Sequence, residues 1–280
     1  MTQEPPILRI EAGRSERHYW ADLFRYRELF FFLAWRDILV RYKQTVIGVA
    51  WSVIRPLLTM LVFVVVFGRI AALPDNGVPY PILVFVAMLP WQFFSNALTE
   101  SSNSLIVNAN MVSKVYFPRM IMPASSVAVA CVDFCISFVL LCGLMAIYKF
   151  APSANLWAFP LFTLFAFVTA LGPGLLLSSL NVKYRDFRYI VPFIVQFGLY
   201  ISPVGFSSNV AREKLGDFAL LYSINPMVGV IDGFRWSVCG SEKFPLDLQG
   251  IALSASVSII LLFLGIWNFR RTEREFADVI

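Results

Sequence analysis

Charged residues are scarce in this chain of 280 residues. Asp, Glu, Lys and Arg make up 15% of it, whereas they make up about a quarter of an average soluble domain. The stretches 150–182 and 189–211 contain none of the four. Hydrophobic residues account for 58% of the chain, and the mean hydropathy is +0.70. Because a water-bounded core cannot bury that much apolar surface, the composition excludes an ordinary soluble domain and indicates an integral membrane protein.

Residues typical of catalytic and metal sites are also few. The single histidine is His18, and no H-E-x-x-H, C-x-x-C or G-x-x-x-x-G-K-[ST] pattern occurs. Such patterns supply zinc ligands, redox pairs and phosphate-binding loops. The four cysteines form no disulfide framework. We therefore expect no catalytic residue, no metal and no cofactor on this chain, so that a chemical step would take place on another subunit.

Long apolar runs are what the chain has in abundance. A helix needs ~20 mostly apolar residues to cross a membrane, and lipid excludes open strands. We expect an all-α membrane protein with six transmembrane helices, at about 48–68, 80–100, 120–147, 157–180, 189–204 and 249–268.

Lys and Arg are distributed unevenly between the two sides of these spans. Sixteen of the 23 lie in the N-terminal segment, the C-terminal tail and the loops 101–119 and 181–189. Cytoplasmic segments of membrane proteins are enriched in Lys and Arg. The asymmetry predicts a multi-pass protein of the plasma membrane with both termini in the cytoplasm.

Two segments outside the spans are unusually apolar. In residues 20–46, apolar residues recur at helical spacing and charged residues occupy the remaining arc, which predicts an amphipathic helix in the membrane interface. It either anchors the protein or packs on a partner subunit, and the two roles are compatible. The last external loop, 205–247, is apolar but interrupted by Asn225 and Pro226, which predicts short re-entrant helices.

Two charged residues fall inside predicted spans. Asp133 lies in the middle of the third span, and Arg55 lies in the first. Each costs about 2.5–3.5 kcal/mol in hydrocarbon on insertion scales. They either form a proton relay or substrate contact, or Asp133 makes a structural hydrogen bond while Arg55 extends to the interface. No span contains a histidine, and pumps normally use several acids and histidines, so the structural interpretation is favoured.

Four stretches carry a family resemblance: RYKQTVIGVAWSVIRPLLTMLVFVVVFGRIA (41–71), PYPILVFVAMLPWQFFSNALTESSNSLIVNANMVSKVYFPR (79–119), LNVKYRDFRYIVPF (180–193) and NPMVGVIDGFRW (225–236). In this order they resemble the permease subunits of polysaccharide-exporting ABC transporters, the exporters of O-antigen, capsule and teichoic acid. The resemblance covers nearly the whole chain after residue 20. One departure is Arg55, where an uncharged polar residue such as Gln is usual.

The resemblance implies a homodimer of six-span permeases with two cytoplasmic ATP-binding subunits, which hold ATP and Mg²⁺. Its cargo would be a lipid-linked glycan, first of all undecaprenyl-diphosphate-linked O-antigen, with capsule or teichoic acid as alternatives; nucleic acid is not expected. We expect four segments: an N-terminal cytoplasmic tail (1–19), an amphipathic interface helix (20–46), a six-span permease domain (47–270) and a C-terminal cytoplasmic tail (271–280).

In such an exporter, force from the ATPase must reach the spans through cytoplasmic loops. The loop 108–119 offers apolar residues and the loop 181–189 is a compact cluster of charges, in which Asp186 is expected to pair locally. For the second loop, retention in the cytoplasm and lipid-headgroup binding is an equal alternative. The expected coupling residues are Val112, Lys114, Val115, Tyr116, Phe117, Arg119, Lys183, Arg185, Asp186 and Arg188.

The substrate path and the lipid head call for other side chains. Aromatic rings can stack on the C–H faces of sugars without selecting one linkage, although many aromatic residues of membrane proteins pack against lipid. The expected path residues are Phe63, Phe67, Phe197, Tyr200 and Phe206. Because guanidinium groups bind phosphate bidentately, the expected ligands of the lipid diphosphate are the basic residues Arg36, Arg41, Lys43 and Arg55.

Two other classes of function stay open. An ion-coupled secondary transporter would normally show inverted repeats and several intramembrane acids, and the sequence shows neither. A membrane-embedded glycosyl- or acyltransferase needs a nucleophile or base near the interface, and no such pair stands out.

Overall fold

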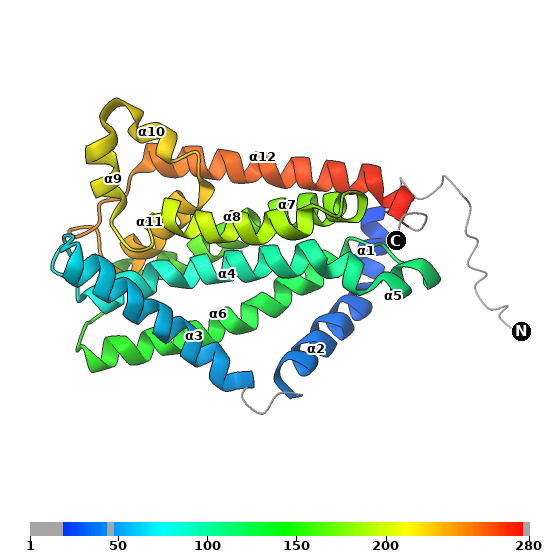
Figure 1. Ribbon diagram of the computed structural model, residues 1–280, viewed down its shortest axis with the longest axis horizontal. Helices are drawn as coiled ribbons and strands as arrows, with labels where there is room; N and C mark the ends of the chain where they lie inside the picture. Colours follow the sequence, from blue (N-terminus) through cyan, green and yellow to red (C-terminus); the bar gives the residue numbers. More distant parts are fainter. Residues whose placement is uncertain (1–18, 44–47, 277–280) are drawn as a thin grey trace, which may run out of the picture.

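The computed structural model describes residues 19–43 and 48–276, and within them all regular elements are helices. The long helices run alongside one another, and both described chain ends lie at one end of the bundle (Figure 1). We call this end of the bundle the terminal end, and the opposite end of the bundle the distal end. Most of the predicted N-terminal tail, the last residues of the predicted interface segment and residues 277–280 lie outside the described residues.

Five helical segments are long and apolar enough to cross a membrane, and they confirm five of the six predicted spans: Ala50–Ile70, Tyr80–Val107, Ile121–Ile147, Ala154–Lys183 and Leu248–Glu275. The elements that form them are α3 (Gly48–Phe63) with the π-helix η2 (Val64–Ile70), α4 (Tyr80–Val107), α6 (Ile121–Ile147), η3 (Ala154–Ala158) with α7 (Phe159–Lys183), and α12 (Leu248–Thr272) with η5 (Glu273–Glu275).

The predicted span at 189–204 is represented by a shorter helix. α8 (Phe187–Ile201) has 15 residues, which extend about 22 Å against a hydrocarbon thickness of about 30 Å. It ends because Ser202, with φ −77° and ψ 151°, is extended, as favoured for a residue that precedes a proline, here Pro203. Five of the predicted spans are therefore clear in the described residues, and the remaining one, at 189–204, is represented by a helix below spanning length.

The remaining helices are short. They are α1 (Tyr19–Arg25), α2 (Arg27–Lys43), α5 (Ala109–Lys114), α9 (Ser208–Leu215), η4 (Gly216–Phe218), α10 (Ala219–Tyr222) and α11 (Pro226–Cys239). α2 runs obliquely to the bundle (Figure 1). The helix breakers noted in the sequence begin α11: the Asn225 side chain accepts a hydrogen bond from the Met227 backbone N–H at 3.1 Å, and Pro226 takes the first helical position. α11 packs against α4, α7 and α12.

α4 is the central helix of the bundle. It contacts α3, α6, α7, α8 and α11, and its residues 82–91 are all buried. A separate hydrophobic cluster lies at the terminal end, where residues from α2, α4, the 108–119 loop, α7 and the C-terminal segment meet. The protein therefore has one core along the spans and a second core that joins its terminal elements.

Glycines allow α7 and α12 to approach closely. A Cβ atom added to Gly172 would lie 2.6 Å from the backbone nitrogen of Leu262, and one added to Gly265 would lie 2.2 Å from the Gly172 carbonyl oxygen. Beside this contact, the hydroxyl groups of Thr169 and Ser258 are hydrogen-bonded at 2.8 Å. Small residues with a buried polar pair are a common way for helices to associate in a membrane.

We expect Gly172→Ala to lower the midpoint of thermal unfolding in detergent, because the added methyl group must push α12 away. Overpacking of this kind costs about 1–3 kcal/mol. Gly143→Ala is the matched control, since nothing lies within 4 Å of its added Cβ and alanine is the better helix former. Equal midpoints for the two variants would contradict the close contact.

Candidate functional site

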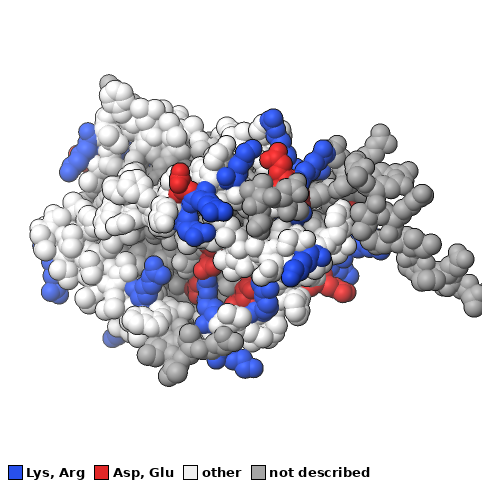
Figure 2. All heavy atoms as spheres, turned by 45° about the vertical axis from the view of Figure 1, so that its right-hand side comes forward, with Lys and Arg blue, Asp and Glu red and all other residues white. Residues whose placement is uncertain are grey.

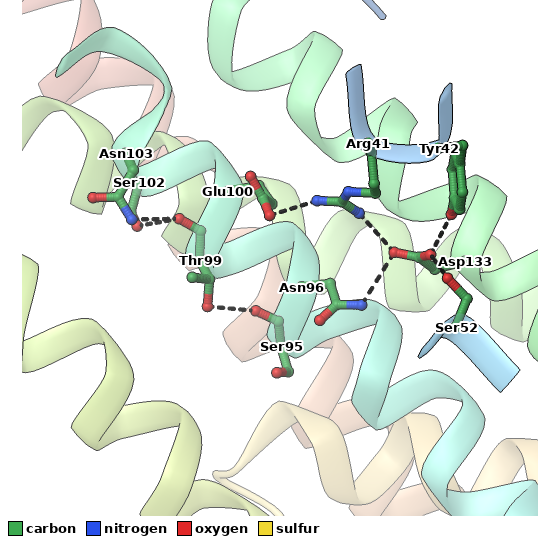
Figure 3. A network of polar contacts seen from close by, with 10 residues as sticks. All are labelled: Arg41, Tyr42, Ser52, Ser95, Asn96, Thr99, Glu100, Ser102, Asn103 and Asp133. Carbon is green, nitrogen blue, oxygen red and sulfur yellow. Dashed lines mark hydrogen bonds and ion pairs between the residues drawn. The ribbon is translucent and has the colours of Figure 1, made fainter. Parts of the chain in front are cut away.

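A network of polar side chains joins α2 to the spans (Figure 3). At its centre, the Asp133 carboxylate of α6 accepts hydrogen bonds from Arg41 at 2.7 Å, Tyr42 at 2.5 Å, Asn96 at 3.3 Å and Ser52 at 3.5 Å. The donors come from α2, α3 and α4, so one carboxylate connects four helices. An acid with this many donors has a structural role in the fold.

Arg41 lies between two carboxylates. Its second nitrogen contacts Glu100 of α4 at 2.5 Å, and the Asp133 side chain is only 16% exposed. Burial and the hydrogen bond to Asp133 raise the pKa of Tyr42 to about 12, so the phenol remains protonated and can donate at neutral pH. The partner of Asp133 is thus Arg41 and not Arg55, whose side chain is exposed.

The four predicted lipid-phosphate ligands divide into two pairs. Arg36 donates to Asn108 at 2.8 Å and pairs with Asp37 at 2.7 Å, and Arg41 is held in the network described above. Lys43 and Arg55 are exposed. Two of the four basic groups therefore attach α2 to the bundle, and two remain accessible to a ligand.

The 108–119 loop is anchored in the second core. Val112 and Phe117 are buried there, 2% and 3% exposed, and the Arg119 backbone N–H donates to the Glu273 carboxylate at 2.7 Å. The Arg119 guanidinium also donates to the Glu273 carbonyl oxygen. Of the apolar residues expected to face a partner, two are thus covered by the chain itself.

The accessible tip of this loop consists of Lys114, Val115 and Tyr116, and the last two are each 55% exposed. Exposed apolar side chains on a loop that is anchored at both ends are suited to contact another protein. We call these three residues the loop tip.

The charged 181–189 loop connects α7 to α8 and also lies at the surface. Lys183, Arg185, Asp186 and Arg188 are exposed. The Lys183 ammonium lies 3.5 Å from the Glu275 carboxylate near the C-terminus. Among the described residues, this is the one ion pair that the loop forms. The local pairing expected for Asp186 is not seen there. Figure 2 brings the terminal end forward and shows Lys and Arg gathered on it, with Asp and Glu among them.

Three of the five predicted path residues meet near the distal end. Phe63 and Phe67 have ring centroids 5.3 Å apart, and Phe67 and Phe206 are 6.5 Å apart. Gly205 allows the approach, because an added Cβ would lie 2.5 Å from the Phe67 ring. The cluster joins the first span to the turn that follows α8.

The other two path residues, Phe197 and Tyr200, lie on the exposed side of α8. Phe197 packs on Phe193, with ring centroids 4.2 Å apart. The predicted aromatic set is therefore split between a packed distal cluster and an open helix face.

A buried arginine holds the turn that carries Phe206. Arg235 of α11 is 0% exposed and donates to the carbonyl oxygens of Phe206 at 2.8 Å and Val204 at 3.1 Å. Tyr80 donates to the neighbouring Gly205 carbonyl at 2.6 Å. Burial lowers the pKa of the Arg235 guanidinium, an effect opposed by the nearby Asp232 carboxylate.

A second set of charged residues connects elements of the segment 205–247, which follows α8 at the distal end. Arg212 contacts Asp232 at 3.1 Å and Asp247 at 3.0 Å, and Ser208 donates to Asp232 at 2.6 Å. Burial raises the pKa of Asp232, while the Ser208 hydrogen bond and Arg212 oppose the shift. α9, α11 and the segment before α12 are joined in this way.

Sequence reasoning did not single out Glu100, Asn96, Arg235 or Asp232. Glu100 stood at the edge of a predicted span, whereas α4 continues to Val107 and places it beside Arg41. A signal was available for the pair on α11, because two opposite charges three residues apart in an apolar segment face the same side of a helix.

The architecture is thus that of an all-helical, multi-pass membrane protein. The model of the family described as "ABC-2 type transporter" matches residues 28–238. The chain belongs to the ABC-2 type transporter family.

Several bacterial proteins are similar to this chain over nearly its whole length. The O-antigen export system permease protein RfbA of Myxococcus xanthus is 27% identical over 92% of this chain and 98% of its own length. The Klebsiella pneumoniae protein of the same description is 26% identical over 88% and 92%. The capsule polysaccharide export inner-membrane protein CtrC of Neisseria meningitidis is 24% identical over 88% and 91%.

We expect Asp133→Asn to be mild and Asp133→Leu to be severe. Asparagine keeps one acceptor oxygen, which can serve Tyr42, and Arg41, which bonds to the other oxygen of Asp133, retains its ion pair with Glu100. Leucine removes both oxygens, so Tyr42, Asn96 and Ser52 lose the acceptor they share, and each such hydrogen bond contributes about 1 kcal/mol. Thermal unfolding of both purified variants measures the difference. Equal losses would show that the charge of Asp133, rather than its hydrogen bonds, maintains the network.

Proposed function

We propose that this chain is the membrane permease of an ATP-driven polysaccharide exporter. The family and the export relatives support this role. The structural observation that carries it is the loop tip, an exposed Lys-Val-Tyr sequence on a loop whose flanks are buried in the second core. Because the flanks of the loop are packed against the spans, movement of a partner bound to the loop tip can be transmitted to the spans.

In this proposal the terminal end faces the cytoplasm of a bacterium and the spans cross its inner membrane. Two ATP-binding subunits, which hold ATP and Mg²⁺, contact the loop tip of two copies of the chain. The exposed Arg185 and Arg188 contact either the same subunits or lipid headgroups. The chain itself is not an enzyme.

The cargo we propose is a lipid-linked polysaccharide, first of all undecaprenyl-diphosphate-linked O-antigen. The relatives named for O-antigen export have higher identity over similar coverage than the capsule relative. Capsule polysaccharide or teichoic acid is the alternative. The accessible Lys43 and Arg55 are suited to the diphosphate, and the open aromatic face of α8 is suited to sugar rings.

The proposed domain division keeps a permease domain at 47–270, with an interface helix before it. α11 and the short helices α9 and α10 are the proposed re-entrant elements. Burial of α11 between α4, α7 and α12 supports this assignment, because broken backbone at membrane depth requires protein around it.

Purification of the tagged chain from its native membrane in a mild detergent tests the proposal. We expect an ATPase to copurify at about one copy per permease, with vanadate-sensitive hydrolysis. Depletion of the chain should stop the appearance of polysaccharide at the cell surface. Purification without an ATPase, together with transport that follows the proton gradient, would replace the proposal with a secondary transporter.

We expect Tyr116→Ala to reduce polysaccharide export several-fold and to weaken ATPase copurification while leaving thermal unfolding unchanged, since the side chain is exposed. Val112→Ala should instead destabilise the protein by about 2 kcal/mol, because it removes buried methyl groups. Tyr148→Ala, an exposed tyrosine at the distal end, is the matched control and should export normally. Normal export by Tyr116→Ala would remove the loop tip from the coupling role.

A further inference from the structure

The accessible side of α4 has an unusual composition for a membrane span. Between Ile82 and Leu105, the side chains that are not buried are all polar: Gln92, Ser95, Asn96, Thr99, Glu100 and Asn103. We call these six the α4 polar face. At about 100° per residue they fall within one arc of the helix, and they extend about 17 Å along it.

A polar face of this kind is the opposite of a lipid-facing surface. On the other spans most of the large exposed side chains are apolar, for example Leu58 and Leu61 on α3 and Phe263 on α12. An amide or hydroxyl group left against hydrocarbon without a partner costs several kcal/mol. The α4 polar face must therefore meet water or a polar partner.

The chain itself satisfies only part of this face. Asn96 and Glu100 are engaged with Asp133 and Arg41, and Asn103 accepts a hydrogen bond from Asn181 at 3.2 Å. The side chains of Gln92 and Ser95 make no hydrogen bond with any described residue. Figure 3 shows Ser95 on the side of α4 turned away from Arg41.

A second copy of the chain would have to cover this face with its own exposed helix surfaces. α3 and α8, which both pack on α4, expose mainly apolar side chains such as Leu61, Phe193 and Ile194. Such surfaces cannot satisfy amides. Sugar hydroxyls can, because each hydroxyl both donates and accepts, as the Gln92 amide and the Ser95 hydroxyl do.

We propose that the α4 polar face lines the terminal half of the glycan path, and that Gln92 and Ser95 hydrogen-bond to the hydroxyl groups of the passing polysaccharide. This inference rests on the proposed function and deepens it. The face begins beside Trp91, which packs on Gly198 of α8, and extends toward the Arg41–Asp133 network. The packed aromatic cluster of Phe63, Phe67 and Phe206 lies at the other end.

Two substitutions test the hydrogen bonds without disturbing the fold. Gln92→Leu and Ser95→Val remove polar groups that no described residue uses. We expect each to lower the rate of polysaccharide appearance at the cell surface about fivefold, the size of one lost hydrogen bond. Ser256→Val, at an exposed position of α12, is the matched control and should export at the normal rate.

Thiol labelling tests the environment independently of export. Gln92→Cys, Ser95→Cys and Ser256→Cys are made in a chain whose four native cysteines are alanine, and membrane vesicles with the partner present are treated with a membrane-impermeant methanethiosulfonate. We expect rapid reaction at 92 and 95 and slow reaction at 256. Equal, slow reaction at all three positions would overturn the inference. So would disulfide formation between two copies at position 92 without reaction with the reagent.

The outcomes separate this inference from the proposed function. If depletion of the chain leaves export unchanged, the proposed function fails, and the glycan contact fails with it. If the chain is required for export but Gln92→Leu and Ser95→Val export normally, the inference alone is overturned, whatever the labelling shows.

Discussion

Hydrocarbon offers no hydrogen bonds, and this constraint determines where the polar side chains of the protein lie. Asp133 is tolerated inside a span because four donors from α2, α3 and α4 converge on it. The requirement acts in both directions, since Arg41 near the end of α2 needs the two carboxylates as much as they need it. The position of α2 against the bundle follows from this mutual dependence rather than from apolar packing alone, as most of its large apolar residues are exposed.

Overlapping contacts join the elements of the terminal end to one another. Arg36 ties α2 to Asn108 at the base of the 108–119 loop, and Arg119 at the other end of that loop is tied to Glu273 after α12. The second core fills the space between them. A load applied at Tyr116 would therefore reach α2, α4 and α12 together, and through Arg41 it would reach α6. The proposed coupling through this loop depends on such contacts, since a loop without them would bend before the spans moved.

Hydropathy predicted five spans well, because the length of an apolar run and the thickness of a bilayer are both local quantities. The fifth run was predicted at 189–204, and α8 ends three residues earlier, at Ile201, because Ser202 before Pro203 is extended. The partner of Asp133 was beyond sequence reasoning, because 92 positions separate it from Arg41 and the sequence contains no rule that joins them. The same limit explains Val112 and Phe117: apolar residues in a loop suggested exposure, and the second core that covers them is assembled from segments distant in sequence.

The two linings proposed for the path suit a polymer that must slide. A hydrogen bond exchanged between water and protein contributes only about 1 kcal/mol net, so an amide such as Gln92 can hold a hydroxyl and release it without a deep energy minimum. Aromatic rings on α8 offer contact without fixed direction. A path built from such weak, repeated contacts accepts many sugars but selects poorly among them. In this proposal selection depends on the charged lipid head, because guanidinium groups bind phosphate bidentately and more strongly. The accessible Arg55 and Lys43, near the start of the first span, are the proposed ligands.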